Sequence, residues 1–289
     1  MGNNVNYAEV FGVELAQKYR RELLSGDLTT EGVNYMGGKT IRMPFLSLQG
    51  FADHSRNGGF NRRNIESDFF VKTLEHDRNV EFFVDTMDVD ETNQAVAAAN
   101  ITNTFDTEFA IPETDAYRFS KLFQEVERLG GHIDSIDMVE DNVIDVFDNY
   151  MLLLDEAEVP VEGRLLYVTP RVMMMLKRAA GTQRFAEFNN ELDRTIRMVD
   201  GVKVVVVPES RMKTAYDFTD GFVPEAGARV MDMVLIHPKT VVAFNKHSYV
   251  KLWAPGSHTV GDGYLYQNRQ YGDLFVVESR VNGVCINVG

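Results

Sequence analysis

The side chains best suited to chemistry are four carboxylates that stand close together in the sequence. They are Asp85, Asp88, Asp90 and Glu91, and a group of this kind can hold a cation. Their spacing, however, lacks the glycine and the ligand positions of a calcium-binding loop. An alanine-rich helical pattern follows them, and carboxylates at a helix N-terminus are stabilised by the positive end of the helix dipole. We therefore interpret them as helix N-terminal carboxylates, with a weak cation site as the alternative.

Other residue types that carry out catalysis are present, but they form no recognisable motif. The six histidines show no HExxH pattern, and Gly256-Ser257-His258 lacks the spacing of a GxSxG elbow. The sequence has no Walker-type phosphate loop and no GxGxxG after a strand. Cys285 is the only cysteine, which excludes an intrachain disulfide and a CxxC metal site, and we expect it in the core. We predict a protein that is not an enzyme, with no catalytic residue, no metal and no cofactor.

Length and charge restrict the class of protein further. A chain of 289 residues with 44% hydrophobic and 25% charged residues is typical of a folded protein of one or two domains. Its formal net charge of −14 disfavours a general nucleic-acid-binding protein, which needs a basic face. No apolar run suits a membrane span, and the first residues lack a signal-peptide pattern. We expect a soluble protein that is made in a cytoplasm and has no membrane partner.

The element that follows the acidic group is a long helical pattern within residues 84–129. Apolar residues recur every four positions in its first half, and the helical period resumes after Pro112. The two sets are Ala97, Ile101, Phe105 and Phe109, then Phe119, Leu122, Val126 and Leu129. Pro112 removes one backbone N–H and clashes with the preceding turn. The pattern predicts either one kinked rod from Glu91 to Leu129 or two ordinary core helices joined at Pro112.

The residues before this helix are mostly extended. Residues 1–36 are expected to form an arm that packs on something else, such as another subunit, because the arm can bury little by itself. The stretches KTIRMPFLSL and SDFFVKTLEHDRNVEFFVD, separated by GFADHSRNGGFNRRN, predict a long two-stranded ribbon with a polar tip. An isolated ribbon is only marginally stable in water, so a neighbour should support it. Between Ile41 and Val71 the chain has no lysine but four arginines, which are Arg42, Arg56, Arg62 and Arg63.

The second half of the chain alternates helix and strand. Asp137 and Glu140 have the spacing of a capping box and predict the start of a helix, and Thr169-Pro170 predicts the start of another. Residues 230–236 predict a buried strand. The end of the chain predicts antiparallel strands, with a tight hairpin turn at Asn282-Gly283.

The order of these parts resembles that of the major capsid proteins of tailed bacteriophages, the Hong-Kong-ninety-seven-type shell fold. The similarity extends over essentially the whole chain. It is carried by GFADHSRNGGF, DRNVEFFVDTMDVDET, PETDAYRFSKL, GRLLYVTP and HPKTVVAFNKHSYVKLWAPGSHTVGDGYLYQNRQYGDLFVVESRVNG, in that order. Two features depart from the family: the loop tip continues into Asn61-Arg62-Arg63, and the chain lacks the large helical N-terminal extension that some members use as a built-in scaffold.

The resemblance implies an α+β fold with five parts. They are an N-terminal arm (1–36), an extended β-ribbon loop (37–83), a peripheral domain with a long spine helix (84–130), an axial domain (131–245) and a return to the peripheral domain (246–289). Copies of the chain would form pentamers and hexamers of an icosahedral shell, which encloses double-stranded DNA without sequence-specific binding. Other implied partners are a separate scaffolding protein and a portal protein. The implied location is the virion, after synthesis in the host bacterial cytoplasm.

Contacts between subunits are expected to involve the ribbon arginines and the acidic group. These candidate interface residues are Arg42, Arg56, Arg62, Arg63, Asp85, Asp88, Asp90 and Glu91. Some relatives join a loop lysine to an asparagine of a neighbour, and the absence of lysine near the loop tip predicts no such cross-link here. Two other functions stay open: an encapsulin-like nanocompartment subunit that encloses a cargo protein, and a soluble enzyme with a cryptic site.

Overall fold

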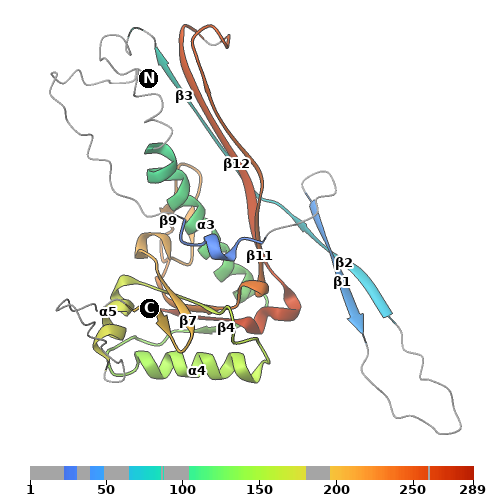
Figure 1. Ribbon diagram of the computed structural model, residues 1–289, viewed down its shortest axis with the longest axis vertical. Coiled ribbons are helices and arrows are strands. Elements are labelled where there is room, and N and C mark those ends of the chain that lie inside the picture. Colours follow the sequence, from blue (N-terminus) through green and yellow to red (C-terminus); the bar gives the residue numbers. More distant parts are fainter. Residues whose placement is uncertain are drawn as a thin grey trace, which may run out of the picture.

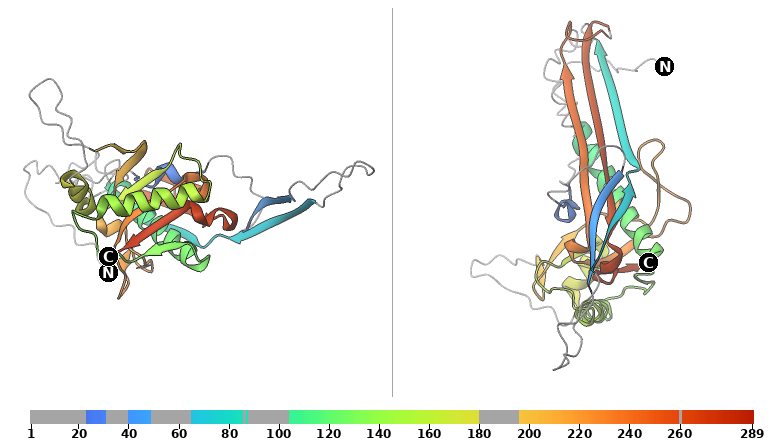
Figure 2. Two further views of the ribbon diagram at one scale, coloured as in Figure 1. Left: turned by 90° about the horizontal axis from the view of Figure 1, so that it is seen from below. Right: turned by 90° about the vertical axis from the view of Figure 1, so that its right-hand side faces the viewer.

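The computed structural model describes residues 23–30, 40–48, 65–85, 87, 104–179, 196–259 and 261–289. These residues form a body, a long three-stranded sheet that rises from the body, and a two-stranded ribbon that projects to one side (Figures 1 and 2). Within them, no helix is long and apolar enough to cross a membrane.

The body is built on a six-stranded mixed sheet. Across the sheet its strands are β4 (His132–Asp134), β13 (Val284–Val288), β10 (Met231–Ile236), β5 (Leu165–Val168), β7 (Val202–Val206) and β6 (Met198–Val199). Alternate residues of a strand face opposite sides of its sheet. Val234 and Ile236 therefore lie in one core cluster, and Met233 and Leu235 lie in a second cluster on the other face. Because both faces are covered, every residue of β10 is buried.

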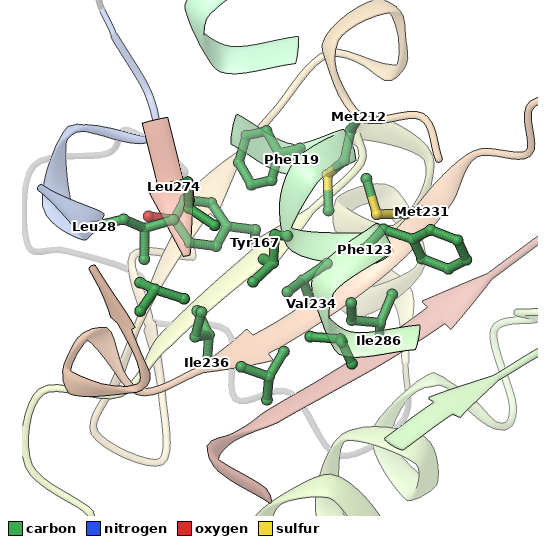
Figure 3. Close-up of a cluster of buried hydrophobic side chains, with 14 of the residues drawn as sticks. Leu28, Phe119, Phe123, Tyr167, Met212, Met231, Val234, Ile236, Leu274 and Ile286 are labelled. Atoms are coloured by element: carbon green, nitrogen blue, oxygen red, sulfur yellow. The ribbon is translucent and has the colours of Figure 1, made fainter. Parts of the chain in front are cut away.

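Helices cover the two faces of this sheet. The helical segments are η1 (Gly26–Leu28), the π-helical turn η2 (Asp106–Ala110), α3 (Ile111–Arg128), α4 (Val143–Glu156), α5 (Pro170–Arg178), η3 (Glu209–Arg211), η4 (Pro238–Thr240) and η5 (Glu278–Gly283). Phe119 and Phe123 of α3 share one cluster with Val234 and Ile286 (Figure 3). α4 and α5 supply most of the helical residues of the cluster on the opposite face.

The helical pattern predicted within residues 84–129 is confirmed in its second half. Phe119, Leu122 and Val126 are buried on one side of α3. Pro112 does not end the helix, because it lies in the first turn of α3 and the π-helical turn η2 precedes it directly. The wider turn of a π-helix accommodates a residue that lacks the N–H of a regular ladder. Ala97 and Ile101, from the first half of the pattern, lie outside the described residues.

The long sheet consists of β11 (Val241–Trp253), β12 (Gly263–Val276) and β3 (His76–Asp85), with β12 in the middle and both pairings antiparallel. α3 and η2 run beside it (Figure 1). A separate short pair, β8 (Tyr216–Asp217) and β9 (Val223–Pro224), lies in the loop region after η3. Because η4 links β10 directly to β11, the long sheet continues from the central strands of the body.

The projecting ribbon consists of β1 (Thr40–Leu48) and β2 (Ile65–Thr73), which pair antiparallel along their whole lengths. This confirms the predicted ribbon, whose tip lies outside the described residues. One part of the prediction was wrong, because the DRNVEFFVD half of the second stretch forms β3 and pairs with β12. The chain turns between the two sheets at Leu74, which is buried against Val242, Phe244 and Phe275. Burial of this one side chain fixes the point at which β2 and β3 part.

Two predictions for the second half were wrong. α4 begins at Val143 rather than at a capping box, because Asn142 accepts a hydrogen bond from the Val139 N–H and donates one to the Asp137 carbonyl, which closes the preceding turn. Asn282-Gly283 forms no hairpin turn. Instead η5 leads from β12 to β13, which pairs with β10 and β4 in the other sheet.

Other predictions are confirmed. The Thr169 hydroxyl accepts a hydrogen bond from the Val172 N–H and caps α5. Residues 231–236 form the buried strand β10. Cys285 lies buried in β13, where burial raises the pKa of its thiol to about 12.

Candidate functional site

The root of the ribbon is fastened to the body by polar contacts at residues 72–75. Lys72 Nζ lies 3.3 Å from Glu125 Oε2 on α3. The backbone N–H of Glu75 donates a hydrogen bond of 3.0 Å to Asp273 Oδ2 on β12. One contact therefore holds the end of β2 and the other holds the turn that follows it. Together they set the direction in which the ribbon leaves the body (Figure 1).

The two acidic partners at this root differ in their electrostatics. Burial alone would raise the pKa of Glu125, but hydrogen bonds and charge from Arg128 and Lys72 hold that pKa below its ordinary value. Burial raises the pKa of Asp273, although hydrogen bonds from Tyr117 and from two backbone N–H groups oppose the shift. The Tyr117 hydroxyl lies 2.7 Å from Asp273 Oδ1. The root thus joins β2, α3 and β12 through charged groups that are shielded from water.

A second fastening holds the segment that precedes the ribbon. Asp115 on α3 accepts hydrogen bonds from the backbone N–H groups of Leu24 (3.2 Å) and Ser25 (2.9 Å), and from the Ser25 hydroxyl (2.7 Å). Arg211 Nη1 lies 3.0 Å from Asp115 Oδ2. Arg118 Nη1 donates to the Ser25 carbonyl at 3.1 Å. Asp115, Arg118 and Arg211 are all buried, and burial lowers the pKa of Arg118. We call these three residues, together with Ser25, the buried anchor.

The buried anchor corrects the prediction for the arm. Residues 23–30 pack on the body of their own subunit: Leu28 is only 1% exposed, and it lies in the same core cluster as Leu274 (Figure 3). The Thr30 N–H also donates to the Ala243 carbonyl of β11 at 2.7 Å. The end of the predicted arm is therefore part of the core, whereas residues 1–22 and 31–36 lie outside the described residues.

The foot of β3 is joined to α3 and to the loop after β8. Arg78 Nε lies 2.6 Å from Glu113 Oε1, and the same guanidinium donates to the carbonyl of Phe218. The His76 ring stacks on Tyr117 with 3.8 Å between ring centroids. Burial, with a contribution from the charge of Arg78, lowers the pKa of His76 to about 4, so this ring is neutral near pH 7.

A groove of about 390 Å³ lies beside this foot, between η2 and the β3–β12 face. Phe105 and Phe109 line it together with Asn268, and Phe109 is 53% exposed. Asp106 accepts a hydrogen bond of 2.9 Å from Asn268 Nδ2, while burial raises the pKa of the Asp106 carboxyl. In the part of the chain that the structure describes, no group of three or more His, Cys, Asp and Glu side chains could hold a metal ion.

The residues predicted for the subunit interface are only partly covered. Arg56, Arg62, Arg63, Asp88, Asp90 and Glu91 lie outside the described residues. Arg42 lies in β1 opposite Val71, close to the root of the ribbon. Asp85 is exposed at the far end of β3, where its carboxylate accepts a hydrogen bond from the Met87 N–H. Since β3 spans about 30 Å at ~3.3 Å per residue, these two positions do not meet within one subunit.

Sequence reasoning missed the buried anchor. Its residues are separated by about ninety positions in the chain, so no local spacing connects Ser25, Asp115 and Arg211. One signal was present: Asp115 stands four positions before Phe119, and Arg118 stands four positions before Leu122. Charged residues there fall on the apolar face of the helix, and charges on such a face require buried partners.

Comparison with known proteins identifies the architecture. No protein-family model matches the chain, and no curated protein matches it by sequence. Solved structures do match: the mature capsid of bacteriophage PhiM1 has 13% identity and a TM-score of 0.68, covering 98% of this chain and 91% of that one. The capsid of the cyanophage P-SCSP1u has 14% identity and a TM-score of 0.68, covering 98% and 93%. A structure of Mycobacterium phage Che8 has 14% identity and a TM-score of 0.61, covering 99% and 98%.

These matches extend over both sheets, the helices between them and the ribbon, so they concern the whole arrangement rather than one common motif. At identities of 13–14%, this structural similarity shows a shared fold. The chain has the fold of tailed-bacteriophage major capsid proteins.

Proposed function

We propose that the chain is a structural major capsid protein, copies of which assemble into pentamers and hexamers of an icosahedral shell around a double-stranded DNA genome. The observation that carries the proposal is the β1–β2 ribbon, which leaves the body and pairs only within itself among the described strands. A two-stranded ribbon is marginally stable alone in water. Its root is nevertheless fixed by Lys72 and Glu75, as expected for an element that must reach a neighbour in a defined direction.

The proposed division of the chain has four parts, and two strands cross between them. The arm is 1–36, the extended loop 37–83, the peripheral domain 84–130 and 246–289, and the axial domain 131–245. β3 belongs by sequence to the loop but pairs within the long sheet, and β13 belongs by sequence to the last segment but pairs within the body sheet. Both strands would therefore tie the proposed parts of one subunit to each other.

Electrostatics supports enclosure of DNA rather than tight binding. A net charge of −14 per subunit opposes the phosphate contacts on which nucleic-acid affinity depends. The remaining proposed partners are a separate scaffolding protein and a portal protein, and the proposed location is the virion, after synthesis in the host bacterial cytoplasm. The ribbon arginines would pair with the acidic group at 85–91 of a neighbouring copy, because the guanidinium fork suits carboxylates.

Electron microscopy of the purified full-length chain, with and without a co-expressed scaffolding protein, tests this function. We expect closed icosahedral shells that are empty or filled with DNA. Shells that enclose a cargo protein would support the encapsulin-like alternative. A stable monomer under all of these conditions would contradict the proposal.

A further inference from the structure

A pocket beside the end of α4 is lined by charged side chains of both signs that form no salt bridge among the described residues. It has a volume of about 320 Å³ and lies between the turn after α4, η4 and η5. η4 and η5 contribute Lys239 and Arg280, and the turn contributes Glu158. Within the described part of the chain, none of these three side chains forms a salt bridge, for which the two charged atoms must lie within 4.0 Å. Charged groups left unpaired beside a pocket are available to a binding partner.

The basic side of the pocket is held rigidly. Arg280 Nη1 donates a hydrogen bond of 3.0 Å to the Lys239 carbonyl, so the guanidinium is fixed against η4. The His237 N–H donates to the Gly283 carbonyl at 3.0 Å. A Cβ atom on Gly283 would lie 2.3 Å from the Thr240 hydroxyl, which shows how closely η4 and η5 approach. Because these segments are already ordered, binding here would cost little conformational entropy.

The acidic side of the pocket has an unusual backbone. Glu158 has a φ of 56°, in the left-handed region that favours glycine. It follows the C-cap of α4, where its N–H donates to the Asp155 carbonyl and the Val159 N–H donates to the Leu154 carbonyl. This is the Schellman arrangement, in which glycine usually occupies the left-handed position. A glutamate at this position adds backbone strain that glycine would avoid, and strained residues of this kind cluster at functional positions.

We propose that this pocket is a contact between two copies of the chain, in which Glu158 of one copy pairs with Lys239 and Arg280 of the other. The inference rests on the proposed shell function, because it requires copies to meet. A patch that carries both signs of charge is complementary to itself, so one two-fold contact would form both sets of pairs. An arginine held by its neighbour presents its remaining N–H groups in a fork that matches a carboxylate.

Substitutions at Glu158 separate a contact role from a folding role. Glu158→Gly removes the carboxylate and also relieves the backbone, so unassembled subunits should unfold at the same or a higher temperature. The protein concentration needed for shell assembly should nevertheless rise by about tenfold or more. Glu158→Gln, which keeps the size of the side chain, should raise it in the same direction. Thermal unfolding of subunits and sedimentation of assembly reactions give the two readouts.

Charge exchange tests the pairing itself. Glu158→Lys alone and the pair Lys239→Glu with Arg280→Glu should each suppress assembly, because like charges would meet across the contact. All three substitutions together should restore shells, since the charges are then exchanged. Glu156→Lys is the matched control: it makes the same change of charge two residues earlier, outside the pocket lining, and should assemble like the unmodified chain.

The outcomes distinguish this inference from the proposed function. Unchanged assembly of Glu158→Lys would overturn the contact and leave the shell function intact. Failure of the triple variant, or equal loss with Glu156→Lys, would also overturn it, because the effect would then reflect net charge or damage rather than pairing. If the unmodified chain forms no shells at all, the proposed function itself is contradicted.

Discussion

Arg211 Nη1 lies 3.0 Å from Asp115 Oδ2, and both side chains are buried, so a charged pair inside the subunit joins η3 to α3. The same carboxylate receives Ser25 and Leu24 from the start of the described chain. The Asp115 carboxylate therefore holds the N-terminal segment on the body. Its loss would leave the charge of Arg211 buried and unpaired.

Asp115→Ala should destabilise the subunit strongly. Removal of one member of a buried ion pair typically costs about 3–5 kcal/mol, because the remaining charge stays desolvated. Urea unfolding of unassembled subunits measures the change. Lys203→Ala is the control, since Lys203 and Asp27 form an exposed pair at 2.6 Å whose loss should cost less than about 1 kcal/mol. Similar effects of the two substitutions would show that the buried anchor is not a major source of stability.

Two truncations of the N-terminal segment should distinguish arm residues, which are needed for assembly, from core residues, which are needed for folding. Deletion of residues 1–22 should leave a folded subunit that fails to build regular shells. Deletion of residues 1–30 should also destabilise the fold, because it removes Leu28 from the core and leaves Asp115 without Ser25. Loss of a buried leucine side chain alone typically costs about 2–5 kcal/mol. Circular dichroism during thermal unfolding would show the difference, and equal stability of the two truncated chains would contradict the assignment of residues 23–30 to the core.

The mature shell should contain no covalent cross-links between subunits. An isopeptide bond needs an amine that can attack an amide, and arginine stays protonated in proteins. Lys72, at the root of the ribbon, lies 3.3 Å from Glu125 rather than near the tip. Purified particles, boiled in detergent and reductant, should run as one band near 32.7 kDa on a denaturing gel. A ladder of pentamer- and hexamer-sized bands would refute this prediction.

Mild acid should destabilise the subunit through His76. Burial lowers the pKa of His76 to about 4, against 6.5 in a model peptide, so between these values the unfolded chain binds the proton more tightly. Neutral His76 should make its full contribution to the free energy of unfolding above pH 6.5. This contribution should then fall by up to about 3 kcal/mol as the pH drops to 4.

The variant His76→Phe isolates this effect. A phenyl ring can keep the stacking on Tyr117 but cannot take up a proton, so its stability should depend less on pH between 6.5 and 4. The comparison is needed because His237, whose pKa is also lowered by burial, contributes in the same direction. Identical pH profiles for the variant and the unmodified chain would rule out the role of His76.

Features that depend on neighbours in the chain could be predicted from the sequence. The spacing of Phe119, Leu122 and Val126 predicted the buried face of α3, and an apolar run predicted β10. Thr169-Pro170 predicted the start of α5, because capping is an interaction over three residues. The order of parts predicted the fold that the capsid structures share. The interface residues of the ribbon and the acidic group stay predictions, since most of them lie outside the described residues.

Which distant segments meet depends on the tertiary structure. β3 and β13 each have a strand pattern in the sequence. Backbone hydrogen bonds are the same for every residue type, so this pattern does not show which strand is the partner. The pairing of β3 with β12 and of β13 with β10 is therefore seen only in the structure. Burial of Leu74 separates β2 from β3, and this depends on side chains from β11 and β12. Likewise, Asp115 is tolerable on an apolar helix face only because Ser25 and Arg211 are brought to it, and the free energy of that arrangement depends on desolvation of the assembled cluster.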